Sequence, residues 1–194
     1  MRFARVLAAL CVAVAGACAA AGPDGAGEQD AAAEFELCFN YSCLTRRTIH
    51  FSAAQMRSLR TELAQATDAA TEREQLSYVI ARMYRWAGEQ SPIGVDRAGD
   101  YLDDGAYGRM DCIDHAHTTN AMLERLQAAG ALHHHRLLDI ARRRSWLIMQ
   151  HFSAVIEDVH DGRQYAVDTW FRDHAEPAVV MEMDRWKSGG YPDD

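Results

Sequence analysis

Apolar side chains recur every three or four positions in three stretches of the chain, which is the spacing of one face of an α-helix. The first helix is expected over 52–67, where Ser52 begins a capping-box sequence, and the second over 71–88. The third is expected over 112–129. The segment between the last two, 89–110, is rich in glycine and aspartate, and so long a loop can shape a cleft.

Beyond the third helix the apolar spacing changes to that of β-strands. Asp161-Gly162 is a hairpin turn signal, and a short helical turn is expected over 184–187. Strands are expected at 137–140, 148–158, 164–171 and 178–183. Helices followed by antiparallel strands predict an α+β domain in which the N-terminal helices and a central helix pack on one antiparallel sheet.

The hairpin around Asp161-Gly162 has a testable register. If Asp158 pairs with Arg163 across the turn, His151 and Asp168 project from the same side of the sheet, offset by one residue pair. A bulge in the turn would reverse this parity.

The N-terminus has the pattern of an export signal. Arg2 and Arg5 precede an uncharged apolar run, and Ala15-Gly16-Ala17-Cys18 is similar to a bacterial lipobox, in which Cys18 becomes lipidated. The alternative is ordinary cleavage a few residues either side of Cys18. We therefore expect a signal peptide over 1–18, a flexible tether over 19–34 and a single domain over 35–194.

The charge balance excludes one class of function. The formal net charge is −8, and without Arg2 and Arg5 it is −10, because 18 basic residues then face 28 acidic ones. Nucleic-acid binding is not expected, since no basic excess is available to neutralise phosphates. We expect an exported, periplasmic protein that contacts the membrane only through its lipid anchor.

Export also indicates which cysteines form a disulfide and which one stays free. Cys38 and Cys43 are close enough in sequence to close a short disulfide loop in an oxidising compartment. Cys112 is then left as the unpaired thiol of the domain.

Cys112 lies where the loop gives way to the third helix. A helix start favours a thiolate, which predicts a pKa below the usual value of about 8.5. His151 and Asp168 follow on the two arms of the hairpin. A thiol, a histidine base and an orienting carboxylate are the parts of a nucleophilic catalytic triad, so we expect Cys112, His151 and Asp168 to be catalytic.

With these residues in view, the stretch 108–171 resembles the transglutaminase-like superfamily, whose fold is related to papain. The nearest pattern is that of the bacterial transglutaminase-like cysteine proteinases, matched here by Asp111-Cys112-Ile113-Asp114-His115-Ala116, with His151 and Asp168 in the other two positions. The resemblance implies a transglutaminase-like domain and a thiol enzyme that attacks amide bonds through a thioester. Peptidase, amidase and acyltransferase outcomes all remain open, and export points to a protein or peptide substrate in the cell envelope.

The resemblance requires no cofactor. Some proteinases of this type hold calcium with acidic residues beside the cysteine, which Asp111 and Asp114 would match, although Ile113 replaces an acidic residue.

Two other readings stay open. Cys112 and His115 have ligand-like spacing for zinc, with His133-His134-His135 or Asp168 to complete the site. A noncatalytic envelope module of the same fold is the other alternative.

Overall fold

The computed structural model describes residues 31–99, 106–145 and 149–192. The described chain is an α+β fold, as predicted, with a two-stranded and a four-stranded antiparallel sheet. Its elements in chain order are β1 (Ala33–Phe39), β2 (Thr45–Phe51), α1 (Ala53–Leu63), α2 (Ala69–Gly88), the 3-10 helix η1 (Pro92–Val95), α3 (Cys112–Ala128), β3 (His135–Ser145), β4 (Met149–Asp158), β5 (Gln164–Asp168), β6 (Val179–Glu182) and α4 (Met183–Lys187).

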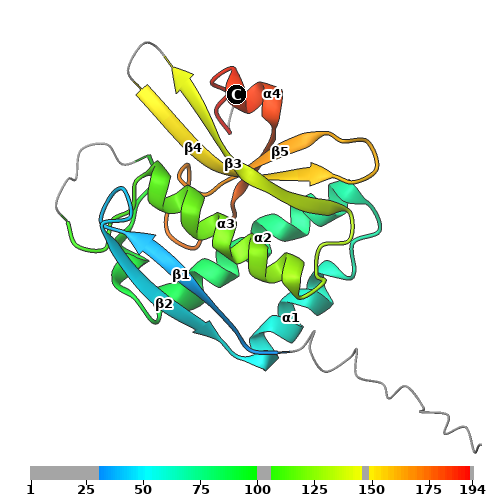
Figure 1. The fold of residues 1–194 in the computed structure, drawn as a ribbon, viewed down its shortest axis with the longest axis horizontal. Helices are drawn as coiled ribbons and strands as arrows, with labels where there is room; N and C mark the ends of the chain where they lie inside the picture. Colours follow the sequence, from blue (N-terminus) through cyan, green and yellow to red (C-terminus); the bar gives the residue numbers. More distant parts are fainter. Residues whose placement is uncertain (1–30, 100–105, 146–148, 193–194) are drawn as a thin grey trace, which may run out of the picture.

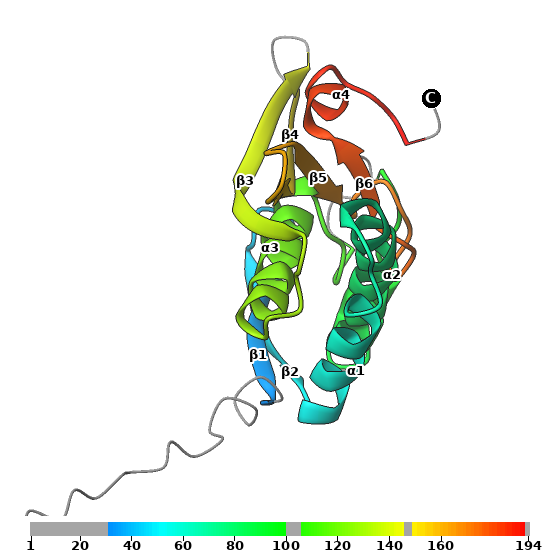
Figure 2. The same ribbon diagram turned by 90° about the vertical axis from the view of Figure 1, so that its right-hand side faces the viewer.

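Helix α3 is the central element (Figure 1). It packs against β1 on one side and against β4 and β3 of the four-stranded sheet on another. Helices α1 and α2 close the remaining side, and Figure 2 shows them facing α3. Because α3 has buried residues on much of its circumference, including Ala116, Met122 and Leu126, it holds the two sheets in one core.

The four-stranded sheet runs in the order β3-β4-β5-β6 and is apolar on both faces. Ala154 and Ile156 belong to the large core on the helical side, whereas Val155 belongs to a smaller cluster around Trp186 of α4. This alternation is the period of two expected of a strand that is buried on both faces. Helix α4 therefore covers the sheet on the face opposite α3.

The hairpin register agrees with the prediction. The backbone N–H of Asp158 donates to the carbonyl of Arg163 at 2.8 Å, and Ala154 pairs with Val167. No bulge interrupts the described β4–β5 pairing. His151 and Asp168 consequently lie on one side of the sheet, one pair apart.

The N-terminal side of the domain differs from the prediction in one respect and extends it in another. Strand β1 begins at Ala33, two residues before the expected start of the domain at residue 35. The β1–β2 sheet was not predicted at all. The signal peptide, Cys18 and most of the tether lie outside the described residues. Within the described residues, every helix is too short or too polar to cross a membrane.

Candidate active site

Helix α3 begins at Cys112 because the residues before it fix its first turn. Asp111 is the N-cap, and its Oδ1 accepts hydrogen bonds from the N–H groups of Ile113 at 3.0 Å and Asp114 at 2.9 Å. Gly108 has a φ of +99°, and an added Cβ there would lie 2.4 Å from the carbonyl oxygen of Pro92. Only glycine fits this turn, which delivers the chain to the helix start.

A disulfide loop lies against the same helix start. Cys38 and Cys43 are bonded, and Cys112 is the free thiol of the described residues, as the sequence predicted. The four residues Asn40 to Cys43 all have positive φ angles, an uncommon run that needs outside support. Asp114 supplies it by accepting hydrogen bonds from the N–H groups of Tyr41 at 2.7 Å and Cys43 at 2.6 Å.

The two aspartates named as possible calcium ligands, Asp111 and Asp114, already accept hydrogen bonds. Oδ2 of Asp111 accepts from the N–H of Ser42, and Oδ2 of Asp114 also accepts from the N–H of Asp111. All four carboxylate oxygens of this pair are thus used by hydrogen-bond donors. Burial, together with the charge of Asp111, raises the pKa of Asp114 to about 6. These carboxylates clamp the loop to the helix.

The zinc reading also lacks support at this position. The His115 ring nitrogens are 2.8 Å from Thr169 Oγ1 and 3.0 Å from Asp96 Oδ2, so both are already engaged. His135 is bound to Glu72 instead of pointing toward Cys112. His115, His135 and Asp168, three of the residues proposed as ligands of a Cys112 metal site, therefore have other partners.

His151 and Asp168 form a buried dyad. The Nε2–H of His151 donates to Oδ2 of Asp168 at 2.6 Å, and the two residues are 8% and 2% exposed. The same carboxylate oxygen accepts from Nε1–H of Trp186 at 2.8 Å, and Oδ1 accepts from the N–H of Trp170 at 3.2 Å. Three donors hold the carboxylate in place, so it can fix the orientation and tautomer of the imidazole.

Aromatic rings enclose the imidazole of His151. The ring centroids of Trp170, Phe171 and Trp186 lie 4.9, 5.4 and 5.7 Å from that of His151. They exclude water from the hydrogen bond between His151 and Asp168, which strengthens it. Trp186 both stacks near the histidine and binds its aspartate, a role that the sequence analysis did not assign to it.

The thiol lies beside the segment of β4 that carries His151. Cys112 Sγ is 3.8 Å from the carbonyl oxygen of Gln150, and the backbone of Phe152 also hydrogen-bonds to this sulfur. The pairing of β4 with β5 covers only Ala154–Glu157. The sulfur therefore sits next to a part of β4 where the described β4–β5 ladder has ended.

The third contact of the triad is open in this structure. No hydrogen bond between Cys112 Sγ and the His151 ring is present among the described residues. Nε2 of His151 is committed to Asp168, which leaves Nδ1 as the nitrogen that can meet the thiol. Such contacts are often long in ligand-free enzymes and tighten when substrate binds.

The predicted low thiol pKa was wrong. Burial is the main cause that raises the pKa of Cys112 to about 11, and the negative charges of Asp111 and Asp168 raise it further. The backbone hydrogen bond from Phe152 lowers this pKa but does not offset the increase. The helix start does not compensate for the loss of water around the sulfur. With this pKa the Cys112 sulfur is protonated near neutral pH.

Alkylation of Cys112 by iodoacetamide is accordingly expected to be slow at pH 7. A rise in thiol pKa from 9.0 to about 11 lowers the thiolate fraction roughly a hundredfold. The rate, followed by mass spectrometry against free cysteine as the control, should rise about tenfold per pH unit up to pH 9 or beyond. A plateau below pH 8.5 would instead indicate a preformed thiolate.

A buried polar chain under the site was not predicted. Asp96 is 1% exposed and accepts a hydrogen bond from the N–H of Met110 at 2.8 Å as well as contacting His115. His115 in turn contacts Thr169, the neighbour of Asp168. This chain joins the residues that lead into Cys112 to those that follow Asp168. His115 is therefore a buried member of this chain, whereas His117 is exposed.

Comparisons of the chain with protein-family models, with curated proteins and with solved structures found no match.

Proposed function

We propose that this protein is a thiol enzyme that attacks amide bonds with Cys112, using His151 as the base and Asp168 to orient it. The observation that carries the proposal is the buried 2.6 Å hydrogen bond between His151 and Asp168 beside a free thiol at a helix start. Cys112 at the start of α3 would supply the nucleophile, and its sulfur contacts the backbone of β4 on either side of His151, the proposed base. The transglutaminase-like resemblance of this segment agrees with the same roles.

The proposed reaction has two stages. In the first, Nδ1 of His151 takes the thiol proton while Sγ bonds to the amide carbon, and the amine leaves with that proton as the carbon–nitrogen bond breaks. Asp168 stabilises the imidazolium that forms in between. In the second stage the thioester is cleaved by water, giving an acid, or by an amine, giving a new amide. The backbone N–H of Cys112, at the helix start, is the donor proposed for the oxyanion.

The proposed substrate is a protein or peptide of the cell envelope. This follows from the signal-peptide pattern of the N-terminus and from the lipobox-like Cys18, which would place the domain on a membrane surface. The Cys38–Cys43 disulfide is consistent with an oxidising compartment. The proposed chemistry needs no metal ion and no organic cofactor.

A noncatalytic module of the same fold is the second candidate, favoured by the raised pKa of the Cys112 thiol. An inert buried cysteine would show the same pKa. The two functions differ in whether His151 can activate the sulfur toward an acyl group.

Acylation by p-nitrophenyl acetate separates them. The folded protein is expected to release p-nitrophenol in a burst and to gain one acetyl group on Cys112, detected by intact-mass and peptide analysis. Cys112→Ala should remove the adduct and His151→Ala should slow its formation strongly. Faster loss of the adduct on adding a primary amine would identify acyl transfer; otherwise water is the acceptor. Equal acylation of the His151→Ala protein would support the noncatalytic module.

A further inference from the structure

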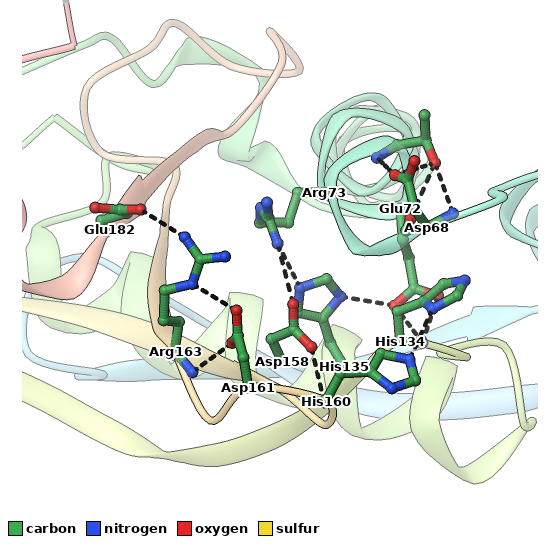
Figure 3. A network of polar contacts seen from close by, with 11 residues as sticks. Asp68, Glu72, Arg73, His134, His135, Asp158, His160, Asp161, Arg163 and Glu182 are labelled. Carbon is green, nitrogen blue, oxygen red and sulfur yellow. Dashed lines mark hydrogen bonds and ion pairs between the residues drawn. The ribbon is translucent and has the colours of Figure 1, made fainter.

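Two histidines lie together where the start of β3 meets the turn between β4 and β5, outside the proposed active site. His134 immediately precedes β3, and His160 lies in the turn between β4 and β5. Figure 3 shows their rings next to each other, with Nδ1 of His134 3.4 Å from Nε2 of His160. His134 is half-buried and His160 is exposed, so solvent reaches the pair.

The separation of the two nitrogens is informative. A hydrogen bond between nitrogen and its acceptor is usually about 2.9–3.0 Å long, so 3.4 Å is a weak one. Two imidazoles that share a tetrahedral metal ion, each with a bond of about 2.0–2.1 Å, place their nitrogens roughly 3.3–3.4 Å apart. The observed spacing matches two ligands of one ion better than it matches a strong hydrogen bond.

The backbone on both sides of the pair is held firmly. The N–H of His134 donates to the buried carboxylate of Glu72, and its carbonyl accepts from the N–H of Val159 at 2.9 Å. The N–H of His160 donates to Oδ1 of Asp158 at 2.9 Å. Metal sites gain affinity when their ligands are positioned before the ion arrives. This pair is positioned in that way.

The carboxylate of Asp68 adds a negative charge near the histidine pair. Asp68 is the N-cap of α2 and lies close to His134. The pKa of Asp68 is lowered mainly by the backbone hydrogen bond from Thr71, and His134 also contributes to lowering it. A nearby negative charge favours a bound cation.

We propose that His134 and His160 form a two-histidine site for a borderline transition-metal ion such as Zn²⁺ or Cu²⁺, with water completing the coordination. The site differs from a zinc centre at Cys112, because it uses neither the thiol nor His135, whose Nδ1–H donates to Glu72 at 2.8 Å. A bound ion would link the start of β3 to the β4–β5 turn.

Zinc titration of the full-length, untagged chain tests the site. The titration is done by calorimetry on protein carrying Cys112→Ser, so that the thiol cannot bind the ion. One Zn²⁺ per chain is expected, with Cu²⁺ bound more tightly. His134→Ala and His160→Ala should each weaken Zn²⁺ binding by at least tenfold, and added Zn²⁺ should raise the melting temperature only where both histidines are present.

His133→Ala is the matched control, because His133 is exposed and adjacent but is not part of the pair. Its affinity for Zn²⁺ should equal that of the parent protein. Unchanged affinity in both the His134→Ala and the His160→Ala proteins would overturn the proposal. An equal loss in the His133→Ala protein would also overturn it, since binding would then belong to the histidine run and not to the pair.

Discussion

Asp168→Asn is expected to slow acylation of Cys112 by about 10³–10⁴-fold, the range found when a triad carboxylate becomes an amide. The amide removes the charge that stabilises the imidazolium. It can also turn its NH₂ group toward Nε2 of His151, which selects the wrong tautomer. The rate of the p-nitrophenol burst, measured by stopped flow, gives the effect directly.

Asp184→Asn is the matched control for this change. Asp184 lies on α4, two residues before Trp186, and is exposed, so its amide should leave the acylation rate within about twofold of the parent protein. Near-ultraviolet circular dichroism shows whether each variant keeps its packing around the tryptophans. A folded Asp168→Asn protein with an unchanged burst would mean that the three residues do not cooperate, and the noncatalytic function would then be preferred.

Glu72→Ala is expected to lower the free energy of unfolding by about 3–5 kcal/mol, because three hydrogen-bond donors lose a buried acceptor at about 1–3 kcal/mol each. The Glu72 carboxylate is fully buried and accepts from the N–H groups of His133 and His134 and from Nδ1–H of His135 (Figure 3). Alanine would leave all three donors without this acceptor. Urea unfolding measures the loss, and the melting temperature should fall by roughly 10 °C.

The same network sets a pH dependence. Burial acts to raise the pKa of Glu72, but the hydrogen bonds from His135 and from the backbone outweigh it, and the net pKa lies below the ordinary 4.5. A lowered carboxyl pKa stabilises the fold above the pKa of the unfolded chain, and that contribution is lost as the pH falls. The difference between parent and Glu72→Ala should therefore shrink in acid.

Glu74→Ala is the control for both measurements, because Glu74 is exposed on the same helix. Its effect on unfolding should stay within about 0.5 kcal/mol. If Glu72→Ala cost no more than this control, the buried network would contribute nothing net to stability.

Local patterns in the sequence predicted the type and order of the later elements but not every bound. Strand β3 is His135–Ser145 where a strand was expected over 137–140, and β5 ends at Asp168 instead of residue 171. The helix expected over 112–129 is α3, and the strand expected over 148–158 is β4, each within a residue or two. Their apolar periods and turn signals act over a few positions, so they can be read without tertiary information. The side shared by His151 and Asp168 followed from the Asp161-Gly162 turn for the same reason.

The β1–β2 sheet was missed although its signal is present. Phe35, Leu37 and Phe39 alternate with the acidic Glu34 and Glu36, the pattern of a half-buried strand. The alternation directly follows a segment rich in alanine, glycine and acidic residues, whose composition is typical of a flexible tether.

Two features of the site depend on long-range packing and could not be predicted from local sequence. The pKa of Cys112 is raised because β4, about 40 residues later in the chain, packs over the sulfur and removes its water. His115 is buried because Asp96, on the far side of the loop, lies opposite its ring. A residue's own neighbours in sequence do not specify either of these partners.

The direction of β1 sets how far the thiol can reach. The strand runs from Ala33 to Phe39, a length of about 20 Å, and its far end leads into the disulfide loop that the start of α3 holds by hydrogen bonds. For a chain anchored at Cys18 as we propose, the covalent length to Ala33 is at most about 50 Å. The nucleophile would then work no higher than roughly 70 Å above the acyl chains, and polymers beyond that height would escape it.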